Sequence, residues 1–235
     1  MIYQGRTEGM NQWKSAHAVR TKARTLAEER KAFEAQKAEL AALDKAIERI
    51  GPSVGIEMHM QPFELNPGMP PEGELVATYL KDKYGMSDEQ FAAGQAQLKA
   101  RGAQEGFEFG ERKYVWNTFD AHRMVRWAAH EGPPEAQHAL KRSMFQAYHG
   151  EGRNPADPSV LMELVENAGL DVDRARAVLD SKEFGEEVRA AEQFWQNLGI
   201  HGVPAVIINR KHLISGGQPS AVFERALREL ANEQA

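Results

Sequence analysis

The sequence predicts an α/β fold in which a large all-helical insertion interrupts a small mixed domain. Strand-like segments occur near both ends of the chain, at residues 56–60 and at residues 205–208 and 212–215. Between about residues 74 and 198 only helical patterns occur, bounded by capping residues, Gly and Pro. We therefore expect a long helical region at residues 1–50, an α/β domain formed by residues 51–73 and 199–235, and a helical insertion at residues 74–198.

The composition of the chain excludes several classes of function. The chain has 235 residues, a net charge of -5 and a 42% hydrophobic content, which is typical of a globular protein and gives no reason to expect nucleic-acid binding. Residues 1–6 lack the apolar core of a signal peptide, and no stretch is apolar enough to span a membrane, so we expect a cytoplasmic protein. The absence of cysteine excludes disulfides, thiolate metal sites and a cysteine nucleophile.

The first region predicts one long helix, because no Pro or Gly occurs between Met10 and Gly51. Apolar residues recur there every seven positions, which is half of a coiled-coil pattern. This stripe either packs on its own domain or meets a second copy of the chain. A helix from Ser15 to Ile50 would extend roughly 50 Å, longer than a small domain needs, so we expect a homodimer. The stripe consists of Val19, Leu26, Phe33, Leu40 and Ile47.

Local signals place several other elements. Ser87 with Gln90 forms a capping box, and Gly169 is a predicted helix stop. A turn at residues 209–211 joins the two last strands, and a helix with one apolar face follows residues 216–219. Further helix starts are expected at Asn117, at Asp157 or Ser159, at Asp171 and at Ser181.

Four segments, taken in order, resemble the FrnE type of DsbA-like proteins. In order, these segments resemble four parts of that family: the stretch after the second strand, a motif of the helical insertion, the cis-proline loop and the lead into the last helix. The resemblance runs from about Leu40 to the C-terminus and implies a thioredoxin-like fold with a helical insertion and thiol–disulfide oxidoreductase activity. The segments are residues 61–73, 117–123, 199–204 and 215–219.

The chain departs from this family at its start. The family begins with a strand and then Cys-Pro-x-Cys, which opens the first helix. Counting back from residues 40–47 puts that motif at Phe33 to Gln36, where no sulfur is present, and residues 25–31 favour helix. The resemblance therefore implies that a long helix replaces the first strand and that Phe33 and Gln36 occupy degenerate cysteine positions.

A loop near the C-terminus keeps the family pattern. The resemblance implies that His201, Gly202, Val203 and Pro204 form a cis-proline loop, whose free backbone groups pair with extended peptides. We expect a cis bond between Val203 and Pro204, since proline is the residue that accepts one readily. We predict peptide binding at these four residues and no catalytic residue.

Other chemistry is not supported by the sequence. His122 and His130 are two helical turns apart, too far to share a metal ion, and no glycine loop has the spacing that phosphate binding needs. We therefore predict no metal and no cofactor.

These observations favour a redox-inactive member that acts as a binding module. The alternative is an enzyme that borrows a thiol from another chain or from glutathione, either as an oxidoreductase or as a glutathione-dependent isomerase. Isomerases similar to 2-hydroxychromene-2-carboxylate isomerase use Ser in place of the first Cys, but Phe33 is not Ser, and Ser15 lies too far upstream. A rearranged or misassigned gene start is a third possibility.

Overall fold

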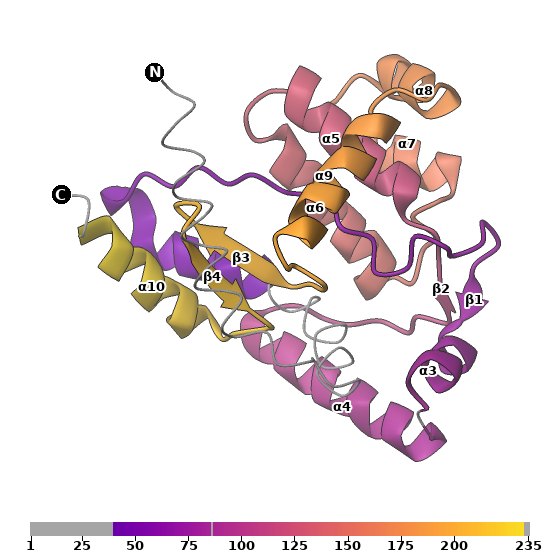
Figure 1. Cartoon of the computed structure of the whole chain (residues 1–235), viewed down its shortest axis with the longest axis horizontal. Coiled ribbons are helices and arrows are strands. Elements are labelled where there is room, and N and C mark those ends of the chain that lie inside the picture. The colour runs from indigo at the N-terminus through magenta and orange to yellow at the C-terminus, as the bar shows by residue number, and fades with distance from the viewer. Residues whose placement is uncertain (1–39, 86, 233–235) are drawn as a thin grey trace. The chain divides into compact units, whose positions relative to one another are not determined.

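The structure is a computed structural model, and it describes residues 40–85 and 87–232 (Figure 1). The chain divides into two compact units. We call the first the hairpin unit; its described residues are 40–56 and 194–232. The second, the helical unit, comprises residues 57–193.

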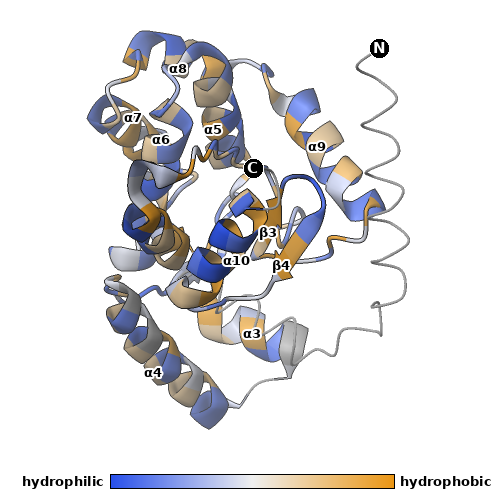
Figure 2. Cartoon of the chain, turned by 90° about the vertical axis from the view of Figure 1, so that its left-hand side faces the viewer, coloured by the Kyte–Doolittle hydropathy of each residue, from blue (hydrophilic) through white to orange (hydrophobic). Residues whose placement is uncertain are grey.

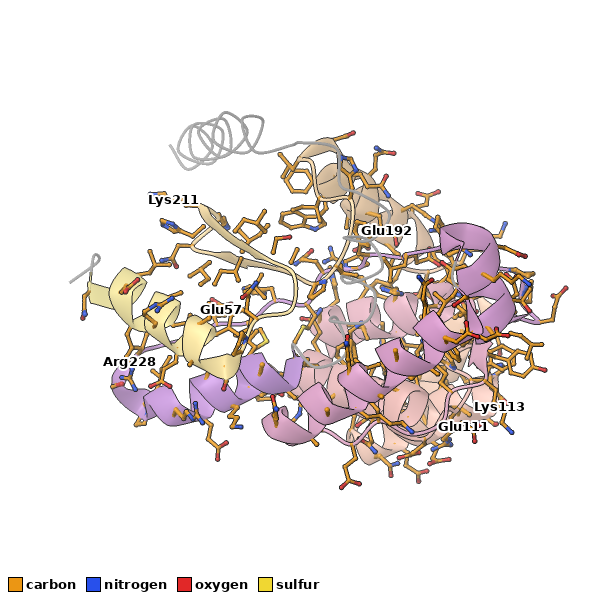
Figure 3. The ribbon with its side chains drawn as sticks, turned by 90° about the horizontal axis from the view of Figure 1, so that it is seen from below. Glu57, Glu111, Lys113, Glu192, Lys211 and Arg228 are labelled. Carbon is orange, nitrogen blue, oxygen red and sulfur yellow. The ribbon has the colours of Figure 1, made fainter. Side chains whose placement is uncertain are left out.

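An antiparallel hairpin gives the first unit its sheet. Strand β3 (Ala205–Ile208) pairs with β4 (His212–Ser215), with Ala205 opposite Ser215 and Ile208 opposite His212, which confirms both predicted strands. Asn209 and Arg210 reverse the chain with φ angles of 53° and 57°, so two residues in succession are left-handed. This conformation suits a tight hairpin turn, and it places Lys211 at the tip (Figure 3).

Two helices supply the core of the hairpin unit. Ala42 and Ala46, from the helix over residues 40–50, and Phe223, from α10 (Ser220–Asn232), are buried together, and Val206 and Ile214 of the hairpin pack against them. Figure 2 shows β3 and β4 as hydrophobic strands beside α10, whose outward residues are largely hydrophilic. The Arg228 guanidinium of α10 donates to the Arg49 carbonyl, which ties the ends of the two helices together.

The seven-residue stripe is only partly within the described residues. Val19, Leu26 and Phe33 lie outside them, whereas Leu40 and Ile47 are half-buried. The core side of the helix over residues 40–50 is instead the line of Ala42, Ala46 and Ile50. The described part of the stripe therefore lies beside the core and not within it.

The helical unit is built from seven α-helices within its described residues. Their apolar faces form one core around Trp127, Leu140, Leu161 and Val165. No helix in residues 40–85 and 87–232 combines the length and apolarity needed to cross a bilayer. The helices are α3 (Val76–Tyr84), α4 (Asp88–Glu105), α5 (Phe119–Glu131), α6 (Ala136–Phe145), α7 (Pro158–Asn167), α8 (Val172–Asp180) and α9 (Gly185–Asn197), with a π-helical turn at Gln146–Gly150 after α6.

Most predicted helix starts are confirmed by their hydrogen bonds. Ser87 and Gln90 form the capping box of α4, and Asp157 and Asp171 cap α7 and α8. The predicted N-cap of α5 is off by one residue, because the N-cap is Thr118 and not Asn117. Asn117 Oδ1 accepts a hydrogen bond from the Phe119 N–H at 2.9 Å. Ser181 is wrong as the start of α9, which begins at Gly185; its hydroxyl accepts from the Glu183 N–H instead.

Two predictions about strands are wrong. Residues 56–60 form no strand in the described structure; the Met60 N–H donates to Gln137 Oε1 at 3.0 Å, and Gln137 Nε2 donates to the Met60 carbonyl at 2.9 Å. A side-chain amide thus takes the place of a ladder partner. The helical unit is also not purely helical, because β1 (Glu74–Leu75) pairs with β2 (Tyr114–Val115).

Gly73 permits this small ladder. Its φ angle is +71°, and a Cβ atom there would collide with the Trp116 ring and the Val115 carbonyl. Only glycine combines this backbone conformation with such a close approach of two chains. Segment 57–73 therefore runs against the helices without regular structure until β1 begins.

Candidate functional site

The loop at residues 201–204 is positioned by the end of α9. Gly199 has a φ angle of 85°, the Gly199 N–H donates to the Gln196 carbonyl, and the Ile200 N–H donates to the Trp195 carbonyl at 3.0 Å. This glycine-terminated helix end turns the chain sharply, and buried Ile200 anchors it. The bond between Val203 and Pro204 is cis, in agreement with the prediction, and Pro204 leads directly into β3.

The predicted peptide-binding residues differ in exposure. His201 is exposed and Val203 half-buried, while Gly202 and Pro204 are buried. The Pro204 carbonyl accepts from the Gly216 N–H at 3.0 Å, which ties the loop to the end of β4. Within residues 40–85 and 87–232, the main-chain groups of Gly202 and Val203 form no hydrogen bond. Among the described residues the loop therefore contains unpaired donors and acceptors, those of buried Gly202 and half-buried Val203, next to an exposed histidine.

The hairpin unit also exposes apolar groups outside the loop. The Phe194 side chain of α9 is 45% exposed, and its ring meets Trp195 edge-on at a centroid distance of 5.0 Å. All four residues of β3 are half-buried, although strands of this composition are usually covered on both faces. In the described part of the chain β3 pairs only with β4, which leaves its other edge without a strand. These features suit an extended apolar segment lying along the loop.

The degenerate cysteine positions, Phe33 and Gln36, lie outside the described residues. The two histidines of α5 have separate contacts within the helical unit. His122 Nδ1 lies 2.7 Å from the Thr118 carbonyl, and His130 lies 3.3 Å from a Glu187 carboxylate oxygen. Burial, aided by the positive charges of Lys141 and Arg189, lowers the pKa of His122 to about 3.

A second polar cluster, in the helical unit, was not evident from the sequence. Arg189 of α9 contacts two carboxylates, those of Glu64 and Glu192, whose side chains are only 1% and 8% exposed. The Glu64 N–H also donates to Glu192 Oε1 at 2.9 Å. The three residues lie up to 128 positions apart, so no spacing rule connects them.

This cluster holds a costly charge. Glu64 Oε1 is buried and, among the described residues, has no hydrogen-bond partner. Burial raises the pKa of the Glu64 carboxyl above its ordinary value, and the Arg189 guanidinium offsets only part of that effect. The guanidinium in turn lies 4.0 Å from the Phe119 ring centroid, which joins the cluster to α5.

Arg123 satisfies its charge within the protein. Its guanidinium donates to the carbonyls of Val178, Ser181 at 2.8 Å and Glu183 at 3.0 Å, and it pairs with Asp120 at 2.7 Å. It thus caps the C-terminal end of α8, where carbonyls lack helical partners. The motif at residues 117–123 therefore serves to assemble the helices.

This chain is similar in sequence and in fold to known proteins. The family model for the DsbA-like thioredoxin domain matches residues 15–228 of this chain. The chain belongs to the DsbA-like thioredoxin-domain family. It therefore has a thioredoxin-like fold with a helical insertion, and the predicted fold class is confirmed.

Solved DsbA-like structures agree. A probable DsbA oxidoreductase from Streptomyces coelicolor is 34% identical, with a TM-score of 0.78, and the match covers 87% of this chain and 88% of that one. A 2-hydroxychromene-2-carboxylate isomerase is 16% identical, with a TM-score of 0.63 and coverage of 86% and 94%. At that identity the isomerase supports the shared fold alone.

A short stretch of this DsbA-like chain matches a different protein. Over 28 residues it is 79% identical to an NADP-dependent malic enzyme of Rhizobium meliloti, which is 12% of this chain and 4% of that enzyme. The chain thus spans a very small part of that relative's length. A piece of this size is far shorter than a domain.

We predict that Glu64→Gln stabilises the protein increasingly as pH rises. The folded Glu64 carboxyl has a raised pKa, so its contribution to stability is fully present below pH 4.5 and is lost as pH rises through the folded pKa. Glutamine removes this loss while keeping an acceptor for Arg189. By urea unfolding followed by tryptophan fluorescence, we expect a gain of about 1 kcal/mol at pH 7, the usual scale of point mutations.

Glu163→Gln provides the matched control. Arg153 lowers the pKa of the exposed Glu163 carboxyl, so its contribution is present above pH 4.5 and is lost as pH falls through the folded pKa. The two variants should therefore change stability in opposite directions with pH. A Glu64→Gln effect that is independent of pH, or that falls as pH rises, would show that the buried charge is not destabilising.

Proposed function

We propose that this protein is a FrnE-type member of the DsbA-like family that is redox-inactive and binds extended peptides at His201, Gly202, Val203 and Pro204. The observation that carries this proposal is a combination within one chain. All 235 residues lack a thiol, while the loop keeps unpaired main-chain groups within the described structure. The thiol on which the family's chemistry depends is missing, and the unpaired main-chain groups support peptide recognition as the function that is left.

The lack of cysteine supports the redox part of the proposal. Thiol–disulfide exchange requires a thiolate to attack a disulfide sulfur and form a mixed disulfide. No other side chain forms that sulfur–sulfur bond. Methionine sulfur carries no exchangeable proton, so the nine methionines do not replace it.

The geometry of the hairpin unit supports peptide recognition. An extended segment gains affinity from main-chain hydrogen bonds to a sheet edge and selectivity from pockets for alternate side chains. Gly202 and Val203 offer main-chain groups, and half-buried β3 with exposed Phe194 offers apolar contact. An unfolded or extended apolar peptide has the matching chemistry.

The setting we propose is a cytoplasmic homodimer. Leu40 and Ile47, the described members of the stripe, are half-buried beside the core line of Ala42 and Ala46. Half-exposed apolar residues on a helix are suited to burial against a second copy. A thiol-free protein is also compatible with a reducing compartment.

A rearranged coding sequence would explain how a DsbA-like chain lost its cysteines. The 28-residue stretch with 79% identity to a malic enzyme is the observation that motivates this hypothesis. Sequencing the surrounding genomic DNA tests it. An in-frame strand followed by Cys-Pro-x-Cys beside the gene would support a rearrangement.

We predict no turnover in insulin reduction by dithiothreitol, because no residue forms a thiolate. The rate should equal that of the heat-denatured protein, after contaminating thioredoxins have been removed. A parallel assay with glutathione distinguishes the alternative class. Saturable, glutathione-dependent turnover would contradict the binding-module proposal and support an enzyme that borrows its thiol.

We predict that S-carboxymethylated insulin B chain, an unfolded peptide without thiols, shifts the backbone amide signals of residues 201–203 and 205 in NMR titrations, Pro204 having no amide proton. Val203→Asp should weaken binding about tenfold, or roughly 1.4 kcal/mol, by placing a charge in the apolar contact. Lys211→Asp, at the exposed hairpin tip, is the control and should bind normally. Unchanged β3 and β4 signals in the unbound variants exclude misfolding, and an absence of shifts at residues 201–203 and 205 would refute the site.

We predict that the protein has twice its 26.3 kDa chain mass in light scattering at tens of micromolar. Replacing Leu26 and Phe33 by Glu should give the single-chain mass, because the charges would interrupt the apolar seven-residue repeat on which the proposed dimer depends. Glu at Ala27 and Ala35, which lie off the seven-residue repeat, adds the same charge as a control. A single-chain mass for the unmodified protein would exclude the homodimer.

A further inference from the structure

The longer part of the hairpin unit carries no carboxylate side chain. No Asp or Glu occurs from Phe194 to Phe223, a stretch that contains the loop at residues 201–204 and both strands β3 and β4. Aspartate and glutamate make up 34 of the 235 residues, so a stretch of this length would ordinarily contain several. The ionisable side chains that it does contain are all basic: His201, Arg210, Lys211 and His212.

These four basic side chains are not compensated within the described structure. All four are exposed, and none forms an ion pair or hydrogen bond with a described residue. The helices of the same unit differ, because Arg49 and Arg228 both pair with Glu224, at 3.8 and 3.0 Å. The basic groups of the loop and the hairpin are therefore available to an anionic partner.

Only one of the four lies in the loop itself. His201 directly precedes Gly202 and Val203, whose main-chain N–H groups have no hydrogen-bond partner among the described residues. Arg210 and Lys211 lie beyond the opposite end of β3, which spans roughly 13 Å at about 3.3 Å per residue (Figure 3). That separation exceeds the Debye length of ~8 Å at 0.15 M salt, so the hairpin tip contributes little to the field at the loop.

A protonated imidazole beside unpaired N–H groups suits a carboxylate. Histidine is the side chain that gains its charge between pH 5 and 8, and N–H donors bind an ionised carboxylate more strongly than a neutral acceptor. No acidic side chain of the described hairpin unit bonds to His201, since all of them lie on its two helices. They are Asp44, Glu48, Glu224 and Glu229. The basic side chains on the same two helices are Lys45, Arg49, Arg225 and Arg228.

We propose that His201 is a specificity-determining residue of the peptide site and selects extended peptides that carry an aspartate or glutamate side chain. This inference rests on the proposed function, because it assigns the class of peptide that the loop binds. The main chain of the peptide pairs with Gly202 and Val203, and one carboxylate pairs with the His201 imidazolium. An exposed pair of this kind supplies a preference of about threefold and not the bulk of the affinity.

The test is an NMR titration of the full chain at pH 6 in 0.15 M salt with two sets of eight-residue peptides. Both sets alternate threonine and valine and have acetylated and amidated ends. One Glu is moved through the positions in the first set, and Gln replaces it in the second. From the amide signals of Val203 and Ala205, we expect the tightest-binding Glu peptide to exceed its Gln counterpart about threefold in affinity. The ratio should fall towards one at pH 8, where imidazole is neutral.

Three variants complete the test. His201→Gln carries no charge, so its affinities for the paired Glu and Gln peptides should be equal at both pH values. His201→Lys is charged at both pH values, so its preference for Glu should persist at pH 8. His212→Gln is the matched control, because His212 is also exposed and without a described partner but lies on β4. It should keep the preference of the unmodified protein.

The outcomes separate this inference from the proposed function. Equal affinities of the unmodified protein for both peptide sets, with clear shifts from each, would refute the selection of acidic peptides and leave peptide binding intact. A preference that survives in His201→Gln would also overturn the assignment to His201. An absence of shifts from either set would refute the peptide site and this inference together. Unchanged β3 and β4 signals in the unbound variants exclude misfolding as the cause.

Discussion

The main chain of segment 57–73 needs hydrogen-bond partners, and the packing of the helical unit depends on how they are supplied. An unpaired buried N–H or C=O costs about 1–3 kcal/mol, so a segment without a ladder must find other groups. Gln137 meets both main-chain groups of Met60, and Glu192 accepts from Glu64. Asn117 Nδ2 donates to the Met69 carbonyl at 2.8 Å. Polar side chains from α6 and α9, and one from just before α5, therefore hold the segment in place.

This arrangement has an uneven electrostatic cost. Arg123 donates to several carbonyls and to one carboxylate, so its buried charge is well compensated. Glu64 shares one guanidinium with Glu192 and retains an unpartnered oxygen, so its charge is compensated poorly. A buried charge that is only half satisfied is worse than an apolar contact. The least compensated charge among these contacts of the helical unit is thus where segment 57–73 meets α9, and not where Arg123 joins the helices.

The elements that the sequence predicts correctly are those set by residues close together in the chain. The hairpin, the caps at Ser87, Asp157 and Asp171, and the last helix depend on residues a few positions apart. The strand at residues 56–60 was predicted from alternation, which tells which side chains share a face but not whether a partner strand is available. The contacts of Glu64 and Gln137 join distant positions, so they could not be found without the fold. The loop at residues 201–204 was recognised through a family resemblance, not from physical reasoning on its residues.

The catalytic sulfur and the fold are separable in this architecture. The contacts described in both units are made by apolar cores, carbonyls, carboxylates and guanidinium groups, and none requires a thiol. A catalytic cysteine acts through its thiolate and contributes little packing volume, so its loss removes reactivity and leaves the cores intact. The main-chain groups of the loop behave differently. Among the described residues those of Gly202 and Val203 form no hydrogen bond, and the half-buried strand β3 follows them; unpaired groups at a strand edge are suited to pairing with another chain. Under the proposed function, the main-chain groups of Gly202 and Val203 are the part of the hairpin unit that would bind a peptide in the absence of a thiol.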